Sequence, residues 1–493
     1  MRLRSILVAL TLIGGLLAFP ATTGASVGGI TTGYIVVLDG SMTSDGFAAR
    51  VGDEAAVLAA IDAAGGEVTN DLTDQIGVLF VEAPLAGFAE TLLATGAVTD
   101  VVEDYGWKAY PTLAELQASG QITVMQPGDA PGGPDESADA LEGLQWSMQQ
   151  IRTAEAHAIE AGSPQVDVGI LDTGIDALHV DFLGLDGSSN VDCSRGHDSI
   201  QFGPGIGVAD PCVDNMFHGT HVAGIVAARA NEVGVVGVAP NVTLIPVKVC
   251  DTEGYCYVSS VVDGITYAGD QGFDVINMSF FTDDDDFEVS TEFKCMTDPQ
   301  QRAFRRAVER AISYARSNGV TPVAALGNSD TDLADPPAGN ECEVIPAEVA
   351  GVVGVTALGP DSGKSYYSNW GEGQADVAAP GGDGTTGDPV NTVLSTIPGN
   401  AWAGLQGTSM ASPHAAGVAA LIISRYGKLD KDGDLGMSPG QVEALLQATA
   451  VDIGIDGYDE CFGHGRIDAL RAVTNDRARL YDATAPFCPE YDE

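Results

Sequence analysis

The stretch GTSMASPHAAGVAALIISRY, residues 407–426, places a serine between a turn of small residues and a long apolar run. From Met410 onward the run is rich in Ala, Val, Leu and Ile, which predicts a buried helix with Pro413 in its first turn. Ser409 would then lie at a helix N-terminus, where free backbone N–H groups and the helix dipole stabilise an oxyanion. Serine is also a common helix cap at this position. A nucleophilic role requires a base and an orienting acid elsewhere in the chain.

Beyond residue 165, short apolar runs alternate with helical stretches. We expect strands at 165–172, 242–249, 274–281, 321–328 and 351–358, and helices at 218–230, 258–269 and 300–319. This alternation predicts an α/β domain with a mainly parallel, doubly wound sheet covered on both faces. In such sheets the reactive groups gather at the carboxyl ends of the strands.

Three more polar residues stand where one of these strands ends or one of these helices begins. Asp172 ends the first strand, His218 opens a helix after the flexible, polar stretch VDNM, and Asn328 follows the strand that starts at residue 321. Taken alone, a histidine is more often structural than catalytic, and an asparagine before serine is a common turn former. Together with Ser409, these side chains would meet at one edge of the sheet.

The segments around these residues resemble a known family. DTGID at 172–176, HGTHVAG at 218–224 and GTSMASPH at 407–414 resemble the three active-site blocks of the subtilisin-like (S8) serine peptidases. GNS at 327–329 resembles that family's oxyanion block, and the chain order Asp, His, Ser is that of subtilisin. The resemblance covers roughly residues 144–475 and ends in GHGRIDALRAV, which is similar to the family's closing segment. The chain is thereby identified as a subtilisin-like peptidase.

The resemblance implies a role for each residue. Ser409 would be the nucleophile and His218 the base and then the acid, while Asp172 would orient the imidazole. The Asn328 amide and the Ser409 backbone N–H would hold the carbonyl oxygen. The implied activity is that of a serine endopeptidase that forms an acyl-enzyme on Ser409.

Two other histidines compete for the role of the base. His221 lies one helical turn after His218, but we find no third ligand for a metal. His414 follows Ser409 by five residues on the same helix and would point away from it. We expect both to be structural. Acid-active sedolisins resemble this family in fold but use Glu where HGTHVAG supplies His218, so that residue argues against them.

The implied chemistry requires no cofactor, although calcium is frequent in the family. Asp430, Asp432 and Asp434 have the odd-even spacing of a calcium loop. Leu435 and Gln441 stand where the EF-hand pattern needs Gly and Glu. The sequence therefore neither predicts nor excludes a structural calcium site.

Residues beside the expected substrate groove depart from the family pattern. Many members have a small residue after NMS, whereas this chain has Phe280 and Phe281, which form either a substrate wall or part of the core. The segment Val344-Ile345-Pro346 resembles the far wall of the family's primary pocket, and Val344 would narrow that pocket. We expect the run Asp283–Asp286 to form a solvated loop rather than a cation-binding site. We expect cleavage after apolar, medium-sized residues rather than after basic pairs.

The N-terminus has the three parts of an export signal. Arg2 and Arg4 precede an apolar stretch from Ile6 to Phe19, and small residues lead to Ala25, after which we expect cleavage. No later segment is long and apolar enough to span a bilayer, and no cysteine follows the apolar stretch to carry a lipid. We expect a secreted, monomeric protein without a membrane anchor.

Residues 33–105 show a separate β-α-β-β-α-β pattern, typical of a small split-βαβ domain. We expect strands at 33–40 and 99–106, two strands around a polar turn within 67–84, and helices at 47–66 and 85–97. Residues 127–142 are rich in Pro, Gly and acids, which indicates a linker or cleavage region. The domain resembles the inhibitory propeptide of many family members. We therefore expect a signal peptide at 1–25, a propeptide at 26–110, a linker and processing region at 111–143 and a peptidase domain at 144–493.

All eight cysteines lie beyond residue 190. An even number in an exported chain predicts disulfides, although eight cysteines allow 105 pairings. No C-x-x-C pair is present, which argues against a thiolate zinc site. We expect Cys250 to pair with Cys256 around the turn DTEGY, and Cys193 to pair with Cys212.

The formal net charge of −47 argues against nucleic acid and anionic membranes as partners. The expected partners are protein or peptide substrates and the chain's own propeptide. Two alternatives to a broad peptidase stay open: a processing peptidase with few targets, and a non-catalytic binding scaffold. The acid-rich, Lys-poor composition fits a saline habitat and fits general solubility equally well.

The charge leads to a prediction about stability. Because salt screens repulsion among the carboxylates, the melting temperature should rise between low salt and about 1 M salt. Calorimetry over a salt series checks this. A melting temperature that falls steadily over the same range would contradict it.

Overall fold

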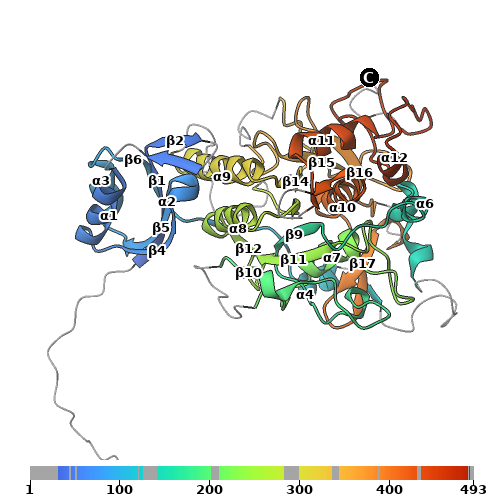
Figure 1. Ribbon diagram of the computed structural model, residues 1–493, viewed down its shortest axis with the longest axis horizontal. Helices are drawn as coiled ribbons and strands as arrows, with labels where there is room; N and C mark the ends of the chain where they lie inside the picture. The colour runs from blue at the N-terminus through green and yellow to red at the C-terminus, as the bar shows by residue number, and fades with distance from the viewer. Residues whose placement is uncertain are drawn as a thin grey trace, which may run out of the picture.

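The computed structural model describes residues 31–43, 46–49, 53–119, 122–125, 141–200, 210–282, 299–335, 343–385, 389–429, 435–486 and 488. The expected signal peptide and the acidic runs at 283–286 and 430–434 lie outside these residues. Figure 1 shows a small N-terminal domain beside a larger one.

In the described part of the larger domain, seven parallel strands form one sheet in the order β10-β11-β9-β13-β14-β15-β16. Their bounds are β9 Asp167–Asp172, β10 His197–Asp198, β11 Thr243–Lys248, β13 Val275–Met278, β14 Thr321–Ala325, β15 Val353–Leu358 and β16 Val377–Pro380. The long strands are buried along nearly their whole length, which explains their unbroken apolar sequences. This confirms the predicted doubly wound α/β fold.

Helices cover both faces of the sheet (Figure 1). On one face α10, Thr408–Tyr426, crosses β13 to β16 and packs against α7, His218–Ala227. On the other face α8, Val258–Gln271, packs against α9, Pro299–Ser317. The helix α10 is buried from Thr408 to Ile423, as expected for a helix that is apolar on all sides. Two further helices, α11 Pro439–Ala448 and α12 Ala469–Thr474, pack on α10.

The N-terminal domain is a four-stranded antiparallel sheet in the order β4-β5-β1-β6. Its elements are β1 Thr31–Leu38, α1 Asp53–Ala63, β4 Glu67–Leu72, α2 Thr73–Ile76, β5 Val78–Pro84, α3 Phe88–Leu93 and β6 Val98–Glu103. The first helix begins at Asp53 and not at Phe47, because β2 Gly40–Thr43 and β3 Gly46–Ala49 form a hairpin. Gly46 in this hairpin has φ +116°, a conformation that favours glycine.

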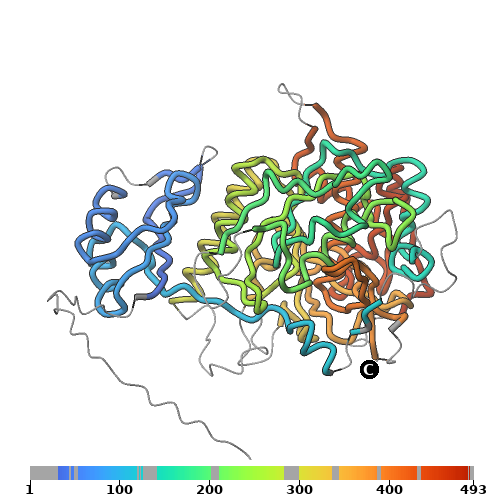
Figure 2. The backbone as a smooth tube through the Cα atoms, turned by 90° about the horizontal axis from the view of Figure 1, so that it is seen from below, coloured from blue at the N-terminus to red at the C-terminus, as the bar shows by residue number. Residues whose placement is uncertain are grey.

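The second face of this small sheet packs on α9 (Figures 1 and 2). The buried Arg310 of α9 donates hydrogen bonds of 3.2 Å to the carbonyl oxygens of Leu38, Ile76 and Gly77. Its guanidinium also lies 4.7 Å from the ring centroid of Phe47. One side chain of the larger domain thus binds three backbone carbonyls of the small domain.

The chain then crosses to the larger domain along its surface, as Figure 2 shows. The strand β7, Gly106–Lys108, pairs antiparallel with β12, Tyr255–Tyr257. The expected linker region also contains α4, Leu113–Ser119, and β8, Thr123–Met125. β8 joins β17 Val393–Ile397 and β18 Ala401–Leu405 in a three-stranded sheet. The segment after residue 110 is therefore docked on the larger domain before it reaches residue 126.

Both expected disulfides are present, Cys193–Cys212 and Cys250–Cys256. A third joins Cys461 to Cys488, which we did not predict. Cys295 and Cys342 lie outside the described residues. In the described ranges, no helix has the length and apolar character needed to cross a bilayer.

The buried arginine gives a test of how the two domains are held. Arg310→Ala removes the donor that these three carbonyls share, although the Gly77 carbonyl still accepts from the Leu38 N–H, and should lower the free energy of unfolding by about 2–3 kcal/mol. Arg306, one turn earlier, forms a more exposed ion pair with Asp100, so Arg306→Ala should cost under about 1 kcal/mol. Denaturant unfolding measures both variants. If both variants lost the same free energy of unfolding, Arg310 would contribute no more to stability than a surface ion pair does.

Candidate active site

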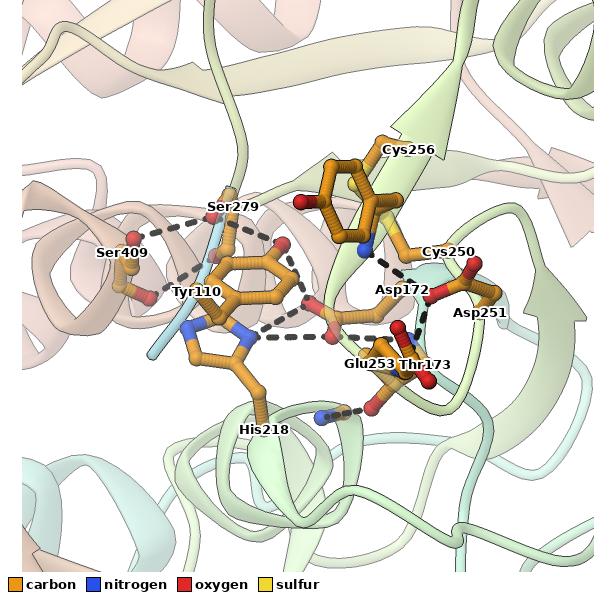
Figure 3. The surroundings of a disulfide bond; sticks show 12 residues. Tyr110, Asp172, Thr173, His218, Cys250, Asp251, Glu253, Cys256, Ser279 and Ser409 are labelled. Atoms are coloured by element: carbon orange, nitrogen blue, oxygen red, sulfur yellow. Dashed lines mark hydrogen bonds and ion pairs between the residues drawn. A yellow bond between two sulfur atoms is a disulfide. The ribbon is translucent and has the colours of Figure 1, made fainter. Parts of the chain in front are cut away.

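Three neighbouring strands bring polar groups to one edge of the sheet. Asp172 is the last residue of β9, Ser279 follows β13 directly, and Asn328 lies three residues beyond β14. Because the three strands are adjacent and parallel, their carboxyl ends face the same space. The starts of α7 and α10 bring His218 and Ser409 to this edge (Figure 3).

His218 and Asp172 form a buried pair. The His218 Nδ1 atom lies 2.9 and 3.0 Å from the two carboxylate oxygens of Asp172. The Thr173 backbone N–H donates to the same carboxylate at 2.8 Å. These contacts fix the imidazole plane and assign the Nδ1 proton to the carboxylate side, which leaves Nε2 as an acceptor.

Asp214 holds the start of α7 and was missed by our sequence analysis, which treated VDNM as a flexible stretch. Its buried carboxylate accepts hydrogen bonds from the backbone N–H groups of Met216, Phe217 and Thr220, at 2.9, 3.0 and 3.0 Å. It also accepts from the hydroxyls of Thr220 and Thr173. Burial raises the pKa of Asp214 despite these donors. An acid shortly before a helix start is a capping signal that could have revealed it.

Ser409 is the second residue of α10, whose N-cap is Gly407, so the serine does not cap the helix. Its hydroxyl donates to the Ser279 carbonyl at 2.9 Å, and the Ser279 hydroxyl donates back to the Ser409 carbonyl at 2.8 Å. We had expected Pro413 in the first turn of this helix. That prediction was wrong, because the helix begins at Thr408 and Pro413 is its sixth residue. Because proline has no N–H for the carbonyl four residues earlier, the Ser409 carbonyl is free to accept from Ser279.

Asn328 is oriented by the residue before Ser409. Its Oδ1 atom accepts from the backbone N–H and the hydroxyl of Thr408, both at 2.9 Å. A Cβ atom placed on Gly407 would lie 3.5 Å from the Asn328 Nδ2 atom and 3.6 Å from the Ser409 backbone N. The two nitrogen donors therefore border the same small space, which the absence of a side chain at Gly407 keeps open.

Tyr110, from the N-terminal segment, covers this site (Figure 3). Its ring stacks on the imidazole of His218 with centroids 3.6 Å apart and an angle of 20° between the planes. Its hydroxyl donates to the Ser279 carbonyl at 3.1 Å and lies 3.4 Å from an Asp172 oxygen. Burial and the Asp172 charge raise the pKa of Tyr110 well above its ordinary value, so the phenol keeps its proton. Tyr110 could be predicted only as a domain boundary, because its contact with Asp172, 62 residues away, has no local sequence signal.

With Tyr110 in place, no hydrogen bond between described residues joins Ser409 to His218. The serine hydroxyl is engaged by Ser279 instead. The sequence-predicted residues Asp172, His218, Asn328 and Ser409 are thus brought together, but the link between hydroxyl and imidazole is not made in this state.

The other histidines have structural contacts. His221 Nε2 contacts the Ala403 carbonyl at 2.9 Å, and burial lowers its pKa to about 3. His414 Nδ1 contacts the Met410 carbonyl at 2.7 Å, and burial lowers its pKa to about 4. Both imidazoles are therefore neutral near pH 7. Among the described residues, no group of three or more His, Cys, Asp or Glu side chains could hold a metal ion.

The three residues expected at the groove are buried. Phe280 is fully buried, and its ring centroid lies 6.3 Å from that of Trp107 in the N-terminal segment. Phe281 and Val344 are also buried. The backbone of Thr282 donates to the Ile345 carbonyl at 3.0 Å, which joins the segment after Phe281 to the segment after Val344.

Comparisons with known proteins agree with this geometry. The model of the subtilase family, peptidase S8, matches residues 163–465. Subtilisin DY of Bacillus licheniformis is 36% identical over 328 residues, which cover 66% of this chain and 98% of the relative. The thermophilic serine proteinase of Bacillus sp. (strain AK1) is 33% identical over 334 residues, which cover 68% of each chain.

Two solved structures share the fold. The epidermin leader peptide processing serine protease of Staphylococcus aureus has a TM-score of 0.68 at 20% identity and covers 91% of this chain and 99% of its own. A lanthipeptide protease has a TM-score of 0.56 at 27% identity and covers 67% of this chain and 94% of its own. The family model and the relatives confirm the resemblance found in the sequence: the chain belongs to the subtilase (S8) family and is a serine-type endopeptidase.

Proposed function

We propose that this subtilase is exported as a zymogen that Tyr110 and the strand β7 hold inactive, and that it removes this segment with its own active site. The observation that carries the proposal is the stacking of Tyr110 on His218 at 3.6 Å. In this proposal residues 1–25 direct export and 26–110 form the propeptide. Residues 111–143 contain the processing region, and 144–493 form the peptidase domain.

In the active state Asp172, His218 and Ser409 act as a catalytic triad. His218 Nε2 takes the Ser409 proton while the hydroxyl oxygen attacks the peptide carbonyl. The tetrahedral intermediate then collapses, the C–N bond breaks, and the leaving amine takes the proton from His218. Water attacks the acyl-enzyme by the same route in reverse and releases the acid. The 2.9 Å contact between His218 and Asp172 supports this assignment, because it holds Nε2 in its acceptor form.

Asn328 and the Ser409 backbone N–H act as the oxyanion hole. Their nitrogen atoms border the space above Gly407, and Thr408 fixes the asparagine oxygen so that its NH₂ group faces that space. The N-terminus of the 19-residue helix α10 adds its dipole at the same place.

The N-terminal segment blocks the site in the manner of a substrate. β7 pairs with β12 through the backbone, and Tyr110 then prevents the imidazole and the Ser409 hydroxyl from meeting. Activation requires that Tyr110 leave, so that the hydroxyl can turn from the Ser279 carbonyl to His218 Nε2. We place the final cut between Tyr110 and Leu144.

Phe280, Phe281 and Val344 form an apolar wall of the substrate groove. The burial of Trp107 beside Phe280 supports this assignment, because the blocking segment places an aromatic side chain where a substrate side chain would lie. Apolar, medium-sized residues should therefore precede the cut. The alternative of a processing peptidase with few targets is favoured by the likeness to a lanthipeptide protease, and a narrow peptide-library profile would support it.

The enzyme works outside the cell as a monomer, on protein or peptide substrates. The disulfides support this location, since such bonds persist in oxidising compartments. The proposed chemistry uses side chains alone and requires no cofactor, and calcium would act only on structure.

The oxyanion hole is tested by Asn328→Ala. The loss of one donor should lower kcat about 10²–10³-fold, the size known for the corresponding donor of subtilisin. Asn318→Ala, at an exposed position after α9, serves as a control and should leave kcat unchanged. An unaltered kcat in correctly folded Asn328→Ala would remove this residue from the mechanism.

Self-processing is tested by Ser409→Ala. Without its nucleophile the chain should accumulate uncut, beginning near Ser26, whereas Ser424→Ala in the same helix should be processed normally. N-terminal sequencing of protein from a protease-deficient host gives the result. Trimming of Ser409→Ala to the mature start would show that another peptidase makes the cut.

Docking of the propeptide should depend on pH through Asp104. Its carboxylate accepts hydrogen bonds from the Ser259 backbone and hydroxyl at the start of α8, and desolvation there raises its pKa from 3.8 to about 6. Because the docked state binds the proton more tightly than the free segment, docking is strongest below about pH 4 and weakens as the pH rises through about 6.

Calorimetric titration of the separate 26–110 segment into the Ser409→Ala peptidase domain should show affinity about ten-fold higher at pH 5 than at pH 8. Asp104→Asn should abolish most of this difference, and Asp62→Asn, on the exposed face of α1, should preserve it. An equal pH dependence in the wild-type and Asp104→Asn segments would assign the effect to another group.

A further inference from the structure

We propose that the Cys250–Cys256 disulfide positions the edge strand that binds the substrate backbone. The inference rests on the proposed function, in which β7 occupies the groove as a substrate would. It assigns the disulfide to the binding of long peptides and not to the bond-breaking step.

The disulfide closes a short hairpin, residues 250–256, that leads into β12. The two cysteines form an antiparallel bridge and are fully buried. Within the loop, the Asp251 N–H donates to the Tyr255 carbonyl at 2.8 Å. The Asp251 side chain accepts from the backbone N–H groups of Glu253 and Tyr255, both at 2.9 Å. The hairpin therefore has one conformation that backbone, side-chain and covalent links all support.

The outer end of this hairpin contacts the segment that fills the groove. The Gly254 carbonyl accepts from the Ala109 N–H at 2.8 Å, and the Val258 N–H donates to the Tyr105 carbonyl at 3.0 Å. Between these bonds, Cys256 itself stands opposite Trp107 in the β12–β7 pair. These contacts involve backbone atoms, so they suit an extended peptide of varied sequence.

The inner end of the hairpin is attached to the catalytic centre. The backbone N–H groups of Val249 and Cys250 donate to the Asp172 carbonyl at 2.9 and 3.2 Å. The disulfide thus links a residue fixed to Asp172 with the central residue of the binding strand, as Figure 3 shows. The distance between the bound backbone and the triad is set through this covalent link.

The strand β12 needs such support once β7 is removed. Among the described residues β7 is its only strand partner, in a two-stranded sheet. Without both the partner strand and the disulfide, an edge strand of three residues would sample more conformations, and binding a peptide would have to restore the order. A covalent link that keeps β12 extended means that less conformational entropy is lost when a peptide binds.

Global stabilisation explains this disulfide less well. Its cysteines are separated by 6 residues, against 19 for Cys193–Cys212 and 27 for Cys461–Cys488. In the chain-entropy description, a disulfide that closes a shorter loop stabilises the fold less. The Cys461–Cys488 pair, which closes the longest of these loops, serves as the matched control.

The test compares two substrates that end in the same residue before the cut: a single-residue ester and a tetrapeptide anilide. In mature Cys250→Ser/Cys256→Ser, kcat/KM for the tetrapeptide should fall about ten-fold through KM, because the strand must be ordered on binding. The ester, which does not reach β12, should keep its kcat/KM within about two-fold. In Cys461→Ser/Cys488→Ser, the ratio of kcat/KM for the tetrapeptide to kcat/KM for the ester should keep its wild-type value.

Fluorophosphonate titration of Ser409 measures the concentration of active enzyme in each preparation. A second variant, Cys250→Val/Cys256→Ala, keeps apolar side chains at both positions but lacks the disulfide. The proposal would be overturned if kcat/KM fell equally for both substrates, or if the ratio of the two kcat/KM values did not change. It would also be overturned if Cys461→Ser/Cys488→Ser changed this ratio to the same extent. So would the absence of labelled enzyme in both hairpin variants, because the disulfide would then serve folding. Failure to label Ser409 in the wild-type enzyme would instead contradict the proposed function.

Discussion

The paired hydrogen bonds between Ser279 and Ser409 are the contact on which the rest of the site depends. They hold the start of α10 against the carboxyl edge of the sheet, where β9 and β14 deliver Asp172 and Asn328. The bond to the Ser409 carbonyl exists because Pro413 offers no N–H to it. A proline inside a buried helix, which would ordinarily weaken it, here frees the acceptor that joins helix and sheet.

In the proposed function, the same edge explains how the chain can be both an enzyme and its own inhibitor. The N-terminal segment pairs with β12 and continues toward His218, and we propose that a substrate peptide follows the same path. Tyr110 then takes the position over the imidazole, and its hydroxyl binds the same Ser279 carbonyl that holds the Ser409 hydroxyl. Asp172 and His218 remain paired beneath Tyr110, so the proposed inhibition requires no distortion of either residue.

The sheet, the clustering of Asp172, His218, Asn328 and Ser409, and two disulfides could be predicted from the sequence because these features have local patterns. Strands buried on both faces read as apolar runs, and Asp172, His218 and Ser409 each stand at the end of such a run or at a helix start. Tyr110 and Arg310 were missed because their partners lie far away in the sequence. Asp214 was missed although an acid shortly before a helix start is a local capping signal. The hairpin at 40–49 was mistaken in part for helix, since FAAR is compatible with helix until the partner strand is known.

The most direct test of this account is the rate at which a fluorophosphonate probe labels the mature peptidase domain, measured with increasing amounts of the separate 26–110 segment. Mass mapping should place the label on Ser409 alone, and the labelling rate should fall to near zero as the segment saturates the enzyme. Label on another residue, or labelling of Ser409 at full rate with the segment bound, would contradict the claim that one nucleophile serves catalysis and that the N-terminal segment blocks it.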